Sequence, residues 1–162
     1  MEPTFALSQR EDKQKAYEEF IPDFKAYLDG EDDWISLLAN ASSALKEAFC
    51  WFWVGFYLVS KDGLLHIGPF QGGPACNRIK KGRGVCGTAW ATGETQVVED
   101  VDKFPGHIAC SSASRSEIVI PMYKNGEIIG VLDIDSEELG TFDATDKKYL
   151  EEIVNYLCHI DC

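Results

Sequence analysis

The chain has 162 residues, of which 27 are acidic and 15 basic, for a formal net charge of −12. Because phosphate backbones and anionic lipids repel so acidic a surface, we expect no nucleic-acid and no membrane partner. The length suits one domain, predicted here to span residues 1–162. The longest apolar run, residues 50–59, is far shorter than the roughly 20 residues that cross a bilayer. The N-terminus has no signal-peptide core, so we expect a soluble cytoplasmic protein.

Two helices are predicted first. Apolar side chains recur every three or four residues over residues 12–28, although Pro22 should kink or split this helix. A second helix is predicted over residues 34–49, where either Asp32 or Asp33 can cap the free N–H groups of the first turn.

A buried strand should follow at residues 51–59, because the run WFWVGFYLV is short and rich in aromatic and branched side chains. The turn KDG leads to a partner strand at residues 64–68. Residues 69–87 are rich in glycine and are predicted to form a loop. The run VCGTAWAT at residues 85–92 then makes a short helix that ends at Gly93.

The second half of the chain alternates strands with one long loop. A brief strand is predicted at residues 96–99, and the polar interval 100–116 is long enough to be functional. Residues 117–123 and 127–135 form a hairpin across KNG, a type I′ turn sequence. A last helix begins after Asp143. The fold class predicted from this order is α+β, with a central antiparallel sheet of about five to six strands and N- and C-terminal helices packed on it.

Six cysteines are many for this length, and in a reducing compartment they should be thiols unless they serve redox chemistry or metal binding. Cys76 and Cys110 lie in the two long loops, where cysteine has no packing role, which indicates function. Cys86 opens the predicted short helix, where the helix dipole and Arg83 favour a thiolate. The alternative is that Cys86 is a small buried apolar residue.

Other cysteine and glycine patterns have ordinary explanations. Cys50 should open the first strand and Cys158 lies on the apolar side of the last helix, so both are interpreted as structural. The run GRGVCG, residues 82–87, spells the G-x-G-x-x-G dinucleotide motif. However, no apolar strand precedes it, so we interpret its glycines as shaping a tight loop.

Carboxylates gather on one strand face. Strand periodicity puts Val131, Asp133 and Asp135 on the same side, and Glu117 begins the neighbouring strand. This side is either a solvated face or the wall of a pocket. In a pocket, clustered acids must bind a cation, such as an amino-acid ammonium, or retain a proton that can protonate a leaving oxygen.

His107 stands three residues before Cys110. It is a candidate base for that thiol, but the preceding Phe-Pro-Gly indicates a rigid turn, so we interpret it as loop support. A further alternative joins Cys76, Cys86, His107 and Cys110 in a zinc site.

Several motifs together resemble one family. They are WVGFYL, GPFQG, GRGVCGTAW, FPGHIAC, SEIVIP and GVLDIDS, spread from about residue 34 to residue 157. In these motifs the sequence is similar to the free methionine-(R)-sulfoxide reductases, which are single GAF domains. The resemblance implies a GAF fold with a small pocket under two loops, and thiol-dependent reduction of free methionine (R)-sulfoxide to methionine.

The resemblance also implies site residues. The catalytic thiols would be the nucleophile Cys110 and the resolving residues Cys76 and Cys86. The substrate-binding residues would be Glu117, Asp133, Asp135, Trp53 and Tyr57. Two positions depart from the family pattern: Ser111 replaces an aspartate and Arg115 an asparagine, changes that should favour the Cys110 thiolate.

The implied reaction needs no cofactor and no metal. Cys110 would become a sulfenic acid and then a disulfide, which thioredoxin or a similar dithiol would reduce. GAF domains commonly form homodimers, so a homodimer is also expected. The alternative from another functional class is a non-catalytic GAF module that senses a small ligand.

Overall fold

A six-stranded, fully antiparallel sheet organises the molecule. The computed structural model describes residues 4–107 and 112–162. The strands are β1 (Trp53–Val59), β2 (Leu64–Gln71), β3 (Arg78–Lys80), β4 (Gln96–Val98), β5 (Ser116–Lys124) and β6 (Glu127–Ser136), in the order β3-β2-β1-β6-β5-β4. The predicted α+β class and antiparallel sheet are confirmed.

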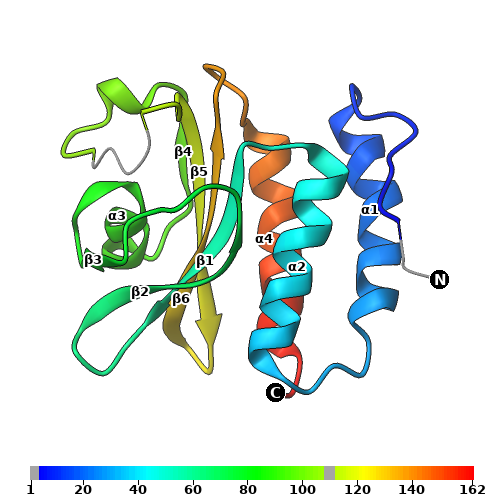
Figure 1. Ribbon diagram of the computed structural model, residues 1–162, viewed down its shortest axis with the longest axis horizontal. Coiled ribbons are helices and arrows are strands. Elements are labelled where there is room, and N and C mark those ends of the chain that lie inside the picture. Colours follow the sequence, from blue (N-terminus) through cyan, green and yellow to red (C-terminus); the bar gives the residue numbers. More distant parts are fainter. Residues whose placement is uncertain (1–3, 108–111) are drawn as a thin grey trace.

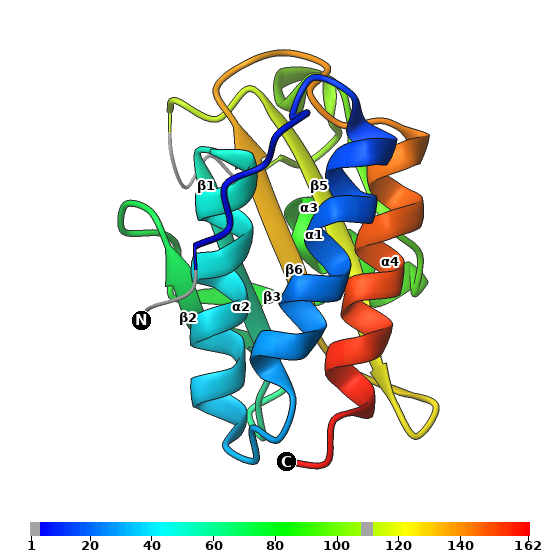
Figure 2. The same ribbon diagram turned by 90° about the vertical axis from the view of Figure 1, so that its right-hand side faces the viewer.

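Helices cover both faces of this sheet (Figure 1). The helices are α1 (Lys13–Leu28), α2 (Trp34–Phe49), α3 (Gly84–Thr92) and α4 (Ala144–His159), with a 3-10 turn η1 (Val101–Lys103). Helices α2 and α4 contact one face, and α1 packs against both of them (Figure 2). Helix α3 covers the opposite face with the long loops around it (Figure 1).

Local sequence explains where the helices begin. Asp33 accepts a hydrogen bond from the Ser36 N–H at 2.7 Å, so it is the cap of α2. At α4, Asp143 and Asp146 form a reciprocal capping box. None of the described helices is both long and apolar enough to cross a membrane.

The β5–β6 hairpin follows the predicted turn. Lys124 pairs with Glu127, and the two residues between them, Asn125 and Gly126, have φ angles of 53° and 78°. Positive φ at both positions is the type I′ geometry that Asn-Gly favours. The hairpin fixes the β6 register that places the acidic residues.

The structure corrects two predicted elements. Pro22 does not split α1, which is continuous through it; the proline removes one backbone donor, and the buried Phe20 and Phe24 hold the helix in place. The interval 69–87 is not all loop, because β2 reaches Gln71 and residues 78–80 form β3. Edge strand β3 has only one buried side chain, which is too weak an apolar pattern to predict a strand.

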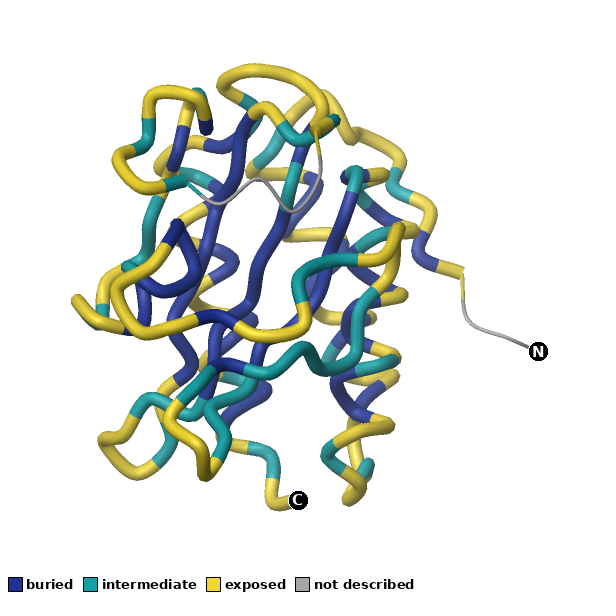
Figure 3. Tube along the Cα trace, turned by 60° about the vertical axis from the view of Figure 1, so that its left-hand side comes forward, coloured by how far each residue is buried: buried dark blue, intermediate teal, exposed yellow. Residues whose placement is uncertain are grey.

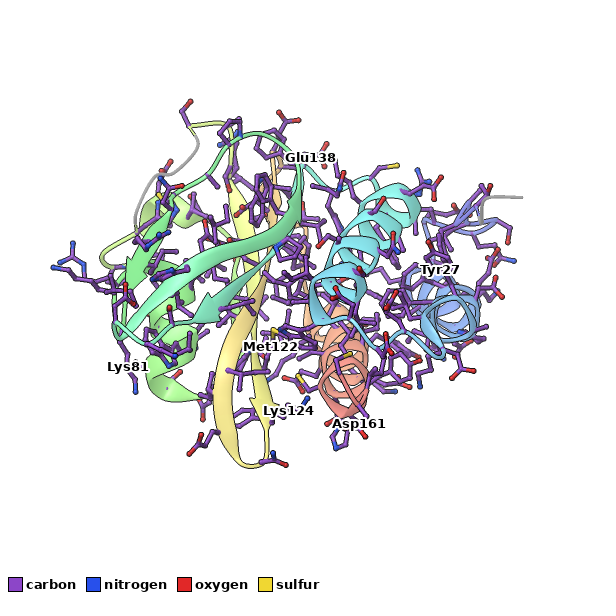
Figure 4. All side chains as sticks on the ribbon, turned by 60° about the horizontal axis from the view of Figure 1, so that its bottom comes forward. Tyr27, Lys81, Met122, Lys124, Glu138 and Asp161 are labelled. Atoms are coloured by element: carbon purple, nitrogen blue, oxygen red, sulfur yellow. The ribbon has the colours of Figure 1, made fainter. Side chains whose placement is uncertain are left out.

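The two sheet faces build two separate apolar clusters. Leu132 and Ile134 of β6 point to the helical layer, as does Met122, which Figure 4 labels between the sheet and those helices. Val131 faces the side of α3. The buried residues therefore follow the central strands (Figure 3), with an apolar core on one face and a mixed, acid-bearing layer on the other.

Candidate active site

A cavity lies between α3 and the sheet face that carries the acids. The cavity has a volume of about 70 Å³, which leaves room for a small molecule only. The predicted site residues that line it come from four elements: Trp53 and Tyr57 from β1, Cys86 from α3, Glu117 from β5, and Asp133 and Asp135 from β6.

Strand register brings the three acids together. Asp135 lies directly opposite Glu117 on one side and Trp53 on the other, while Asp133 pairs with Gly55 and Val119. Asp133 and Glu117 are only 5% and 6% exposed. The interpretation of this side as a solvated face is therefore wrong, and these acids form the floor of a pocket.

Burial raises the pKa of all three acids, and repulsion from neighbouring carboxylates raises it further for Glu117 and Asp135. Burial is the largest cause in each case. For Glu117, Asp133 and Asp135 raise the pKa further. For Asp133, Glu117 and Cys86 act in the opposite direction, as does the charge of His107. The neighbours thus separate the acids: they favour a retained proton on Glu117 and a charged carboxylate at Asp133.

One oxygen of Asp133 has no hydrogen-bond donor among the residues that the structure describes. Its Oδ1 is buried and accepts no hydrogen bond from any residue in the described ranges. A buried acceptor without a donor is costly and is rare in folded proteins. Because Asp133 lines the cavity, a cationic or N–H-bearing ligand could satisfy this oxygen.

Aromatic residues of β1 close the other side and hold the loop above it. The Trp53 indole donates to the Gly73 carbonyl at 2.9 Å, and the Tyr57 hydroxyl donates to the Cys76 carbonyl at 3.0 Å. Burial, followed by the charges of Asp133 and the other cavity acids, raises the pKa of Tyr57, so it stays a neutral donor. The wall therefore sets the position of the backbone at Cys76.

Cys86 is a buried thiol at the third position of α3. Burial raises its pKa well above the ordinary value, and Asp133 and Glu117 raise it further. The prediction that the helix dipole makes this residue a thiolate is therefore wrong. The structure supports the alternative that Cys86 is a small buried residue.

Of the remaining predicted residues, the structure describes Cys76, His107 and Arg115. Cys76 is half-buried and disulfide-bonded. His107 lines the cavity, and its N–H donates to the Phe104 carbonyl at 3.2 Å, in keeping with loop support. Cys110 and Ser111 lie outside the described residues. Arg115 is exposed, and its backbone pairs with Ser136 and Val101.

Sequence reasoning did not place Ser114 or Arg83 in the cavity. Ser114 donates from its hydroxyl to Asp135 at 3.1 Å, and Arg83, exposed at the start of α3, also lines the cavity. A serine two residues before a strand carries no signal of its own. Only the register of β5 against β6 brings it to Asp135.

The side chains that could bind a metal ion differ from the zinc ligands proposed as an alternative from the sequence. Among residues 4–107 and 112–162, the side chains close enough to share an ion are Cys86, Glu117 and Asp133. Cys76 cannot serve in the disulfide-bonded form, which disfavours the zinc set built on both long loops.

Comparison with known proteins assigns this arrangement to a family. A family model for the GAF domain matches residues 31–158. GAF domain-containing protein A of Dictyostelium discoideum is 57% identical over 145 residues, covering 90% of this chain and 92% of that protein. The free methionine-R-sulfoxide reductase of Escherichia coli (strain K12) is 48% identical over 146 residues, with 90% and 88% covered.

A solved structure agrees with these sequences. The X-ray structure of free methionine-R-sulfoxide reductase from Neisseria meningitidis in complex with its substrate matches with a TM-score of 0.93 and 52% identity. The match covers 98% of this chain and 94% of that one. The fold and its cavity thus define a GAF-domain protein. Within that class, the chain belongs to the free methionine-(R)-sulfoxide reductase family of oxidoreductases, as the resemblance implied.

Proposed function

We propose that this protein reduces free methionine (R)-sulfoxide to methionine. The observation that carries the proposal is the small cavity with three buried or partly buried acids on one wall and two aromatic residues on another. A solved relative with this fold, at 52% identity, is described as bound to its substrate. The proposal extends that activity to this chain.

The cavity suits a free amino acid. The ammonium group would lie beside Asp133 and Asp135, where the Asp133 Oδ1 has no donor from residues 4–107 and 112–162. The methyl sulfoxide end would lie against the faces of Trp53 and Tyr57. Because the acids are buried, an amide nitrogen in place of the ammonium would leave their charge unbalanced, which excludes peptide-bound methionine sulfoxide.

Glu117 is the acid we assign to proton transfer. Burial and both neighbouring aspartates all favour its protonated form. An acid with a raised pKa inside a site can give its proton to a developing oxyanion at neutral pH. Burial raises the pKa of Asp133 as well, but Glu117, Cys86 and His107 favour its charged form, so it is better suited than Glu117 to hold the substrate cation.

The reaction proposed for Cys110 has two steps, formation of a sulfenic acid and its conversion to a disulfide. The Cys110 thiolate attacks the sulfoxide sulfur, the oxygen is protonated, and methionine leaves as Cys110 becomes a sulfenic acid. A second thiol then condenses with the sulfenic acid, forming the disulfide and releasing water. The sulfoxide gains two electrons and two cysteines lose them.

Cys76 is the proposed resolving residue in this cycle, with Cys86 as the second candidate. Cys76 is disulfide-bonded in the structure, whereas Cys86 is a free thiol. We propose that Cys76 and Cys110 form the disulfide of the catalytic cycle. Cys86 lies beside Asp133 and Glu117, so a role close to the substrate fits it better than disulfide exchange.

The partners and location stay predictions. Thioredoxin or a similar dithiol is the proposed reductant, because a protein disulfide is regenerated by exchange with a dithiol. A homodimer, a single domain over residues 1–162, and a cytoplasmic location are likewise proposed. Sedimentation of the purified chain checks the first of these three, and fractionation checks the last.

The direct test offers racemic free methionine sulfoxide to the protein with dithiothreitol. We expect half of the substrate, the R epimer, to be consumed, and no consumption of a peptide that contains methionine sulfoxide. Cys110→Ser should abolish turnover, while Cys158→Ser, a buried cysteine on α4 far from the cavity residues in the fold, should not. Consumption of neither epimer would refute the proposal.

The same sample separates the enzyme from a ligand-sensing module. One equivalent of free methionine sulfoxide, added to the reduced protein, should lower the protein mass by two hydrogens as a disulfide forms. A sensor would bind the ligand with no change in mass.

A further inference from the structure

The cavity brings one sulfur and two carboxylates close enough to share an ion. The Sγ of Cys86 and one oxygen from each of Glu117 and Asp133 lie within 4.8 Å of one another, and all three side chains are buried. They come from α3, β5 and β6, so only the folded chain assembles them. Sulfur with carboxylate oxygen is a donor combination that Zn²⁺ accepts.

We propose that Cys86, Glu117 and Asp133 form a binding site for a thiophilic divalent cation, with Zn²⁺ as the natural occupant. A second observation points to a cation here: Asp133 lines the cavity, and its Oδ1 is buried and accepts no hydrogen bond within the described part of the chain. A metal ion would supply the positive charge that this oxygen lacks.

The geometry requires only small side-chain movement. Zn–S and Zn–O bonds of about 2.3 Å and 2.0–2.2 Å put the ligands of a tetrahedral site roughly 3.5 Å apart. The three donor atoms, at 4.8 Å or less, would approach one another by roughly 1 Å to reach this spacing. Three protein ligands with a water in the fourth position is the arrangement of an open zinc site.

Ligand type decides which cations enter. Mg²⁺ and Ca²⁺ prefer six or more oxygen ligands and have little affinity for sulfur. The Cys86 sulfur therefore selects Zn²⁺ or Cd²⁺ over both. The site is distinct from the predicted set of Cys76, Cys86, His107 and Cys110, because two of its three ligands are acids of the sheet.

Occupation of this site would inhibit reduction. The ion would take the place that we propose for the substrate ammonium beside Asp133, so Zn²⁺ and free methionine sulfoxide should compete. This consequence depends on the proposed function, whereas metal binding itself does not. The two can therefore fail separately.

The experiment titrates Zn²⁺ into the full chain, reduced and then freed of reductant under argon, by calorimetry. Co²⁺ is used in parallel, because a thiolate ligand gives it a charge-transfer absorption band. We expect one ion per chain and a thiolate band. The band should disappear in Cys86→Ser, and Asp133→Asn should weaken Zn²⁺ binding by more than the roughly 10–100-fold typical of residues that only support a ligand.

Two controls make the assignment specific. Cys158→Ser removes another buried thiol, on α4, and should bind both ions as the parent does. A Cys76→Ser/Cys110→Ser double variant should also keep the band, because neither residue is a ligand in this proposal. Circular dichroism on every variant confirms folding. No binding, a band that survives in Cys86→Ser, or a band lost in either control would overturn the proposal.

Competition is measured last. Racemic free methionine sulfoxide should weaken Zn²⁺ binding to the parent chain. If Zn²⁺ binds as described but the sulfoxide has no effect, the metal site stands and the proposed substrate position is wrong.

Discussion

The indole of Trp53 lies directly over the Cα of Gly55, two residues along β1. A Cβ placed on Gly55 would meet the Cη2 of Trp53 at 2.5 Å and would collide with the Cβ of Phe70. Gly55 pairs with Asp133 of β6. The missing side chain therefore lets the aromatic wall approach the acidic floor of the cavity.

Gly55→Ala should displace Trp53 and damage the cavity. Because the added methyl has no free space, we expect a loss of about 1–3 kcal/mol in the free energy of unfolding. We also expect a large rise in KM for free methionine sulfoxide. Urea unfolding and steady-state kinetics measure the two effects.

Gly73→Ala is the stability control for that variant. A Cβ at Gly73 would meet no atom within 4 Å, so its unfolding free energy should stay within about 0.5 kcal/mol of the parent. Equal losses in the two variants would show that contact with Trp53 is not the cause.

Tyr57→Phe should affect the second step of the reaction more than the first. The lost hydroxyl holds the backbone of Cys76 through a 3.0 Å hydrogen bond to its carbonyl. Without it, the proposed resolving thiol is less well placed, and stability should fall by about 1 kcal/mol. We expect sulfenic acid to accumulate after one equivalent of substrate, detected by a sulfenic-acid trapping reagent and mass spectrometry.

Tyr123→Phe is the control variant for Tyr57→Phe. The Tyr123 hydroxyl also donates to a backbone carbonyl, that of Gly93 at 2.9 Å, but on the surface and outside the cavity. It should accumulate no sulfenic acid. Accumulation in both variants would argue against a positioning role for Tyr57.

Glu117→Gln should stabilise the protein at neutral pH while it abolishes activity. The pKa of Glu117 is raised by burial, so the folded chain holds this proton more tightly than the unfolded chain. The stability from that proton is complete below the unfolded pKa and is lost as the pH rises through the folded pKa. Glutamine resembles the protonated form at every pH and avoids this loss.

Thermal unfolding between pH 4 and 8 in the presence of a chelator tests whether Glu117→Gln is more stable than the parent. The melting temperature of Glu117→Gln should exceed that of the parent, by an amount that grows as the pH rises above the ordinary glutamate value of 4.5. Glu138→Gln removes an exposed acid and should show no such trend. A parent protein that gains stability relative to Glu117→Gln with rising pH would contradict the raised pKa.

Much of the fold was predictable because its signals are local. The β5–β6 hairpin follows from alternating side chains and an Asn-Gly turn, and strand periodicity correctly placed Asp133 and Asp135 on one face. Whether that face meets solvent or a pocket depends on α3, which arrives from a distant part of the chain. No local pattern decides it.

Two cysteines show where local reasoning failed. The helix dipole favours a thiolate at Cys86, but burial, and after it the acids of β5 and β6, raise the pKa of this thiol and reverse the effect. Cys50 was predicted to open a strand, yet it is the exposed C-cap of α2 with φ at 57°. A left-handed cap on a residue other than glycine has no clear sequence signal.

Asp146→Asn should weaken the helical layer without touching the cavity. Asp146 is buried, accepts from the Tyr17 hydroxyl at 2.7 Å and pairs with Lys13 at 2.5 Å. It also completes the α4 capping box. Loss of its charge leaves Lys13 with a weaker partner, so we expect a loss of about 2 kcal/mol, discounted because Lys13 is partly exposed.

The matched surface pair should be worth much less. Lys25 and Glu152 also join α1 to α4, at 3.6 Å, but both side chains are at least 39% exposed. Glu152→Gln should therefore cost under about 1 kcal/mol. Urea midpoints with unchanged slopes measure both costs, and activity per folded molecule should match the parent in both variants. If Asp146→Asn and Glu152→Gln lose the same unfolding free energy, the burial of Asp146 adds nothing to stability. Its capping bonds alone would then account for the loss.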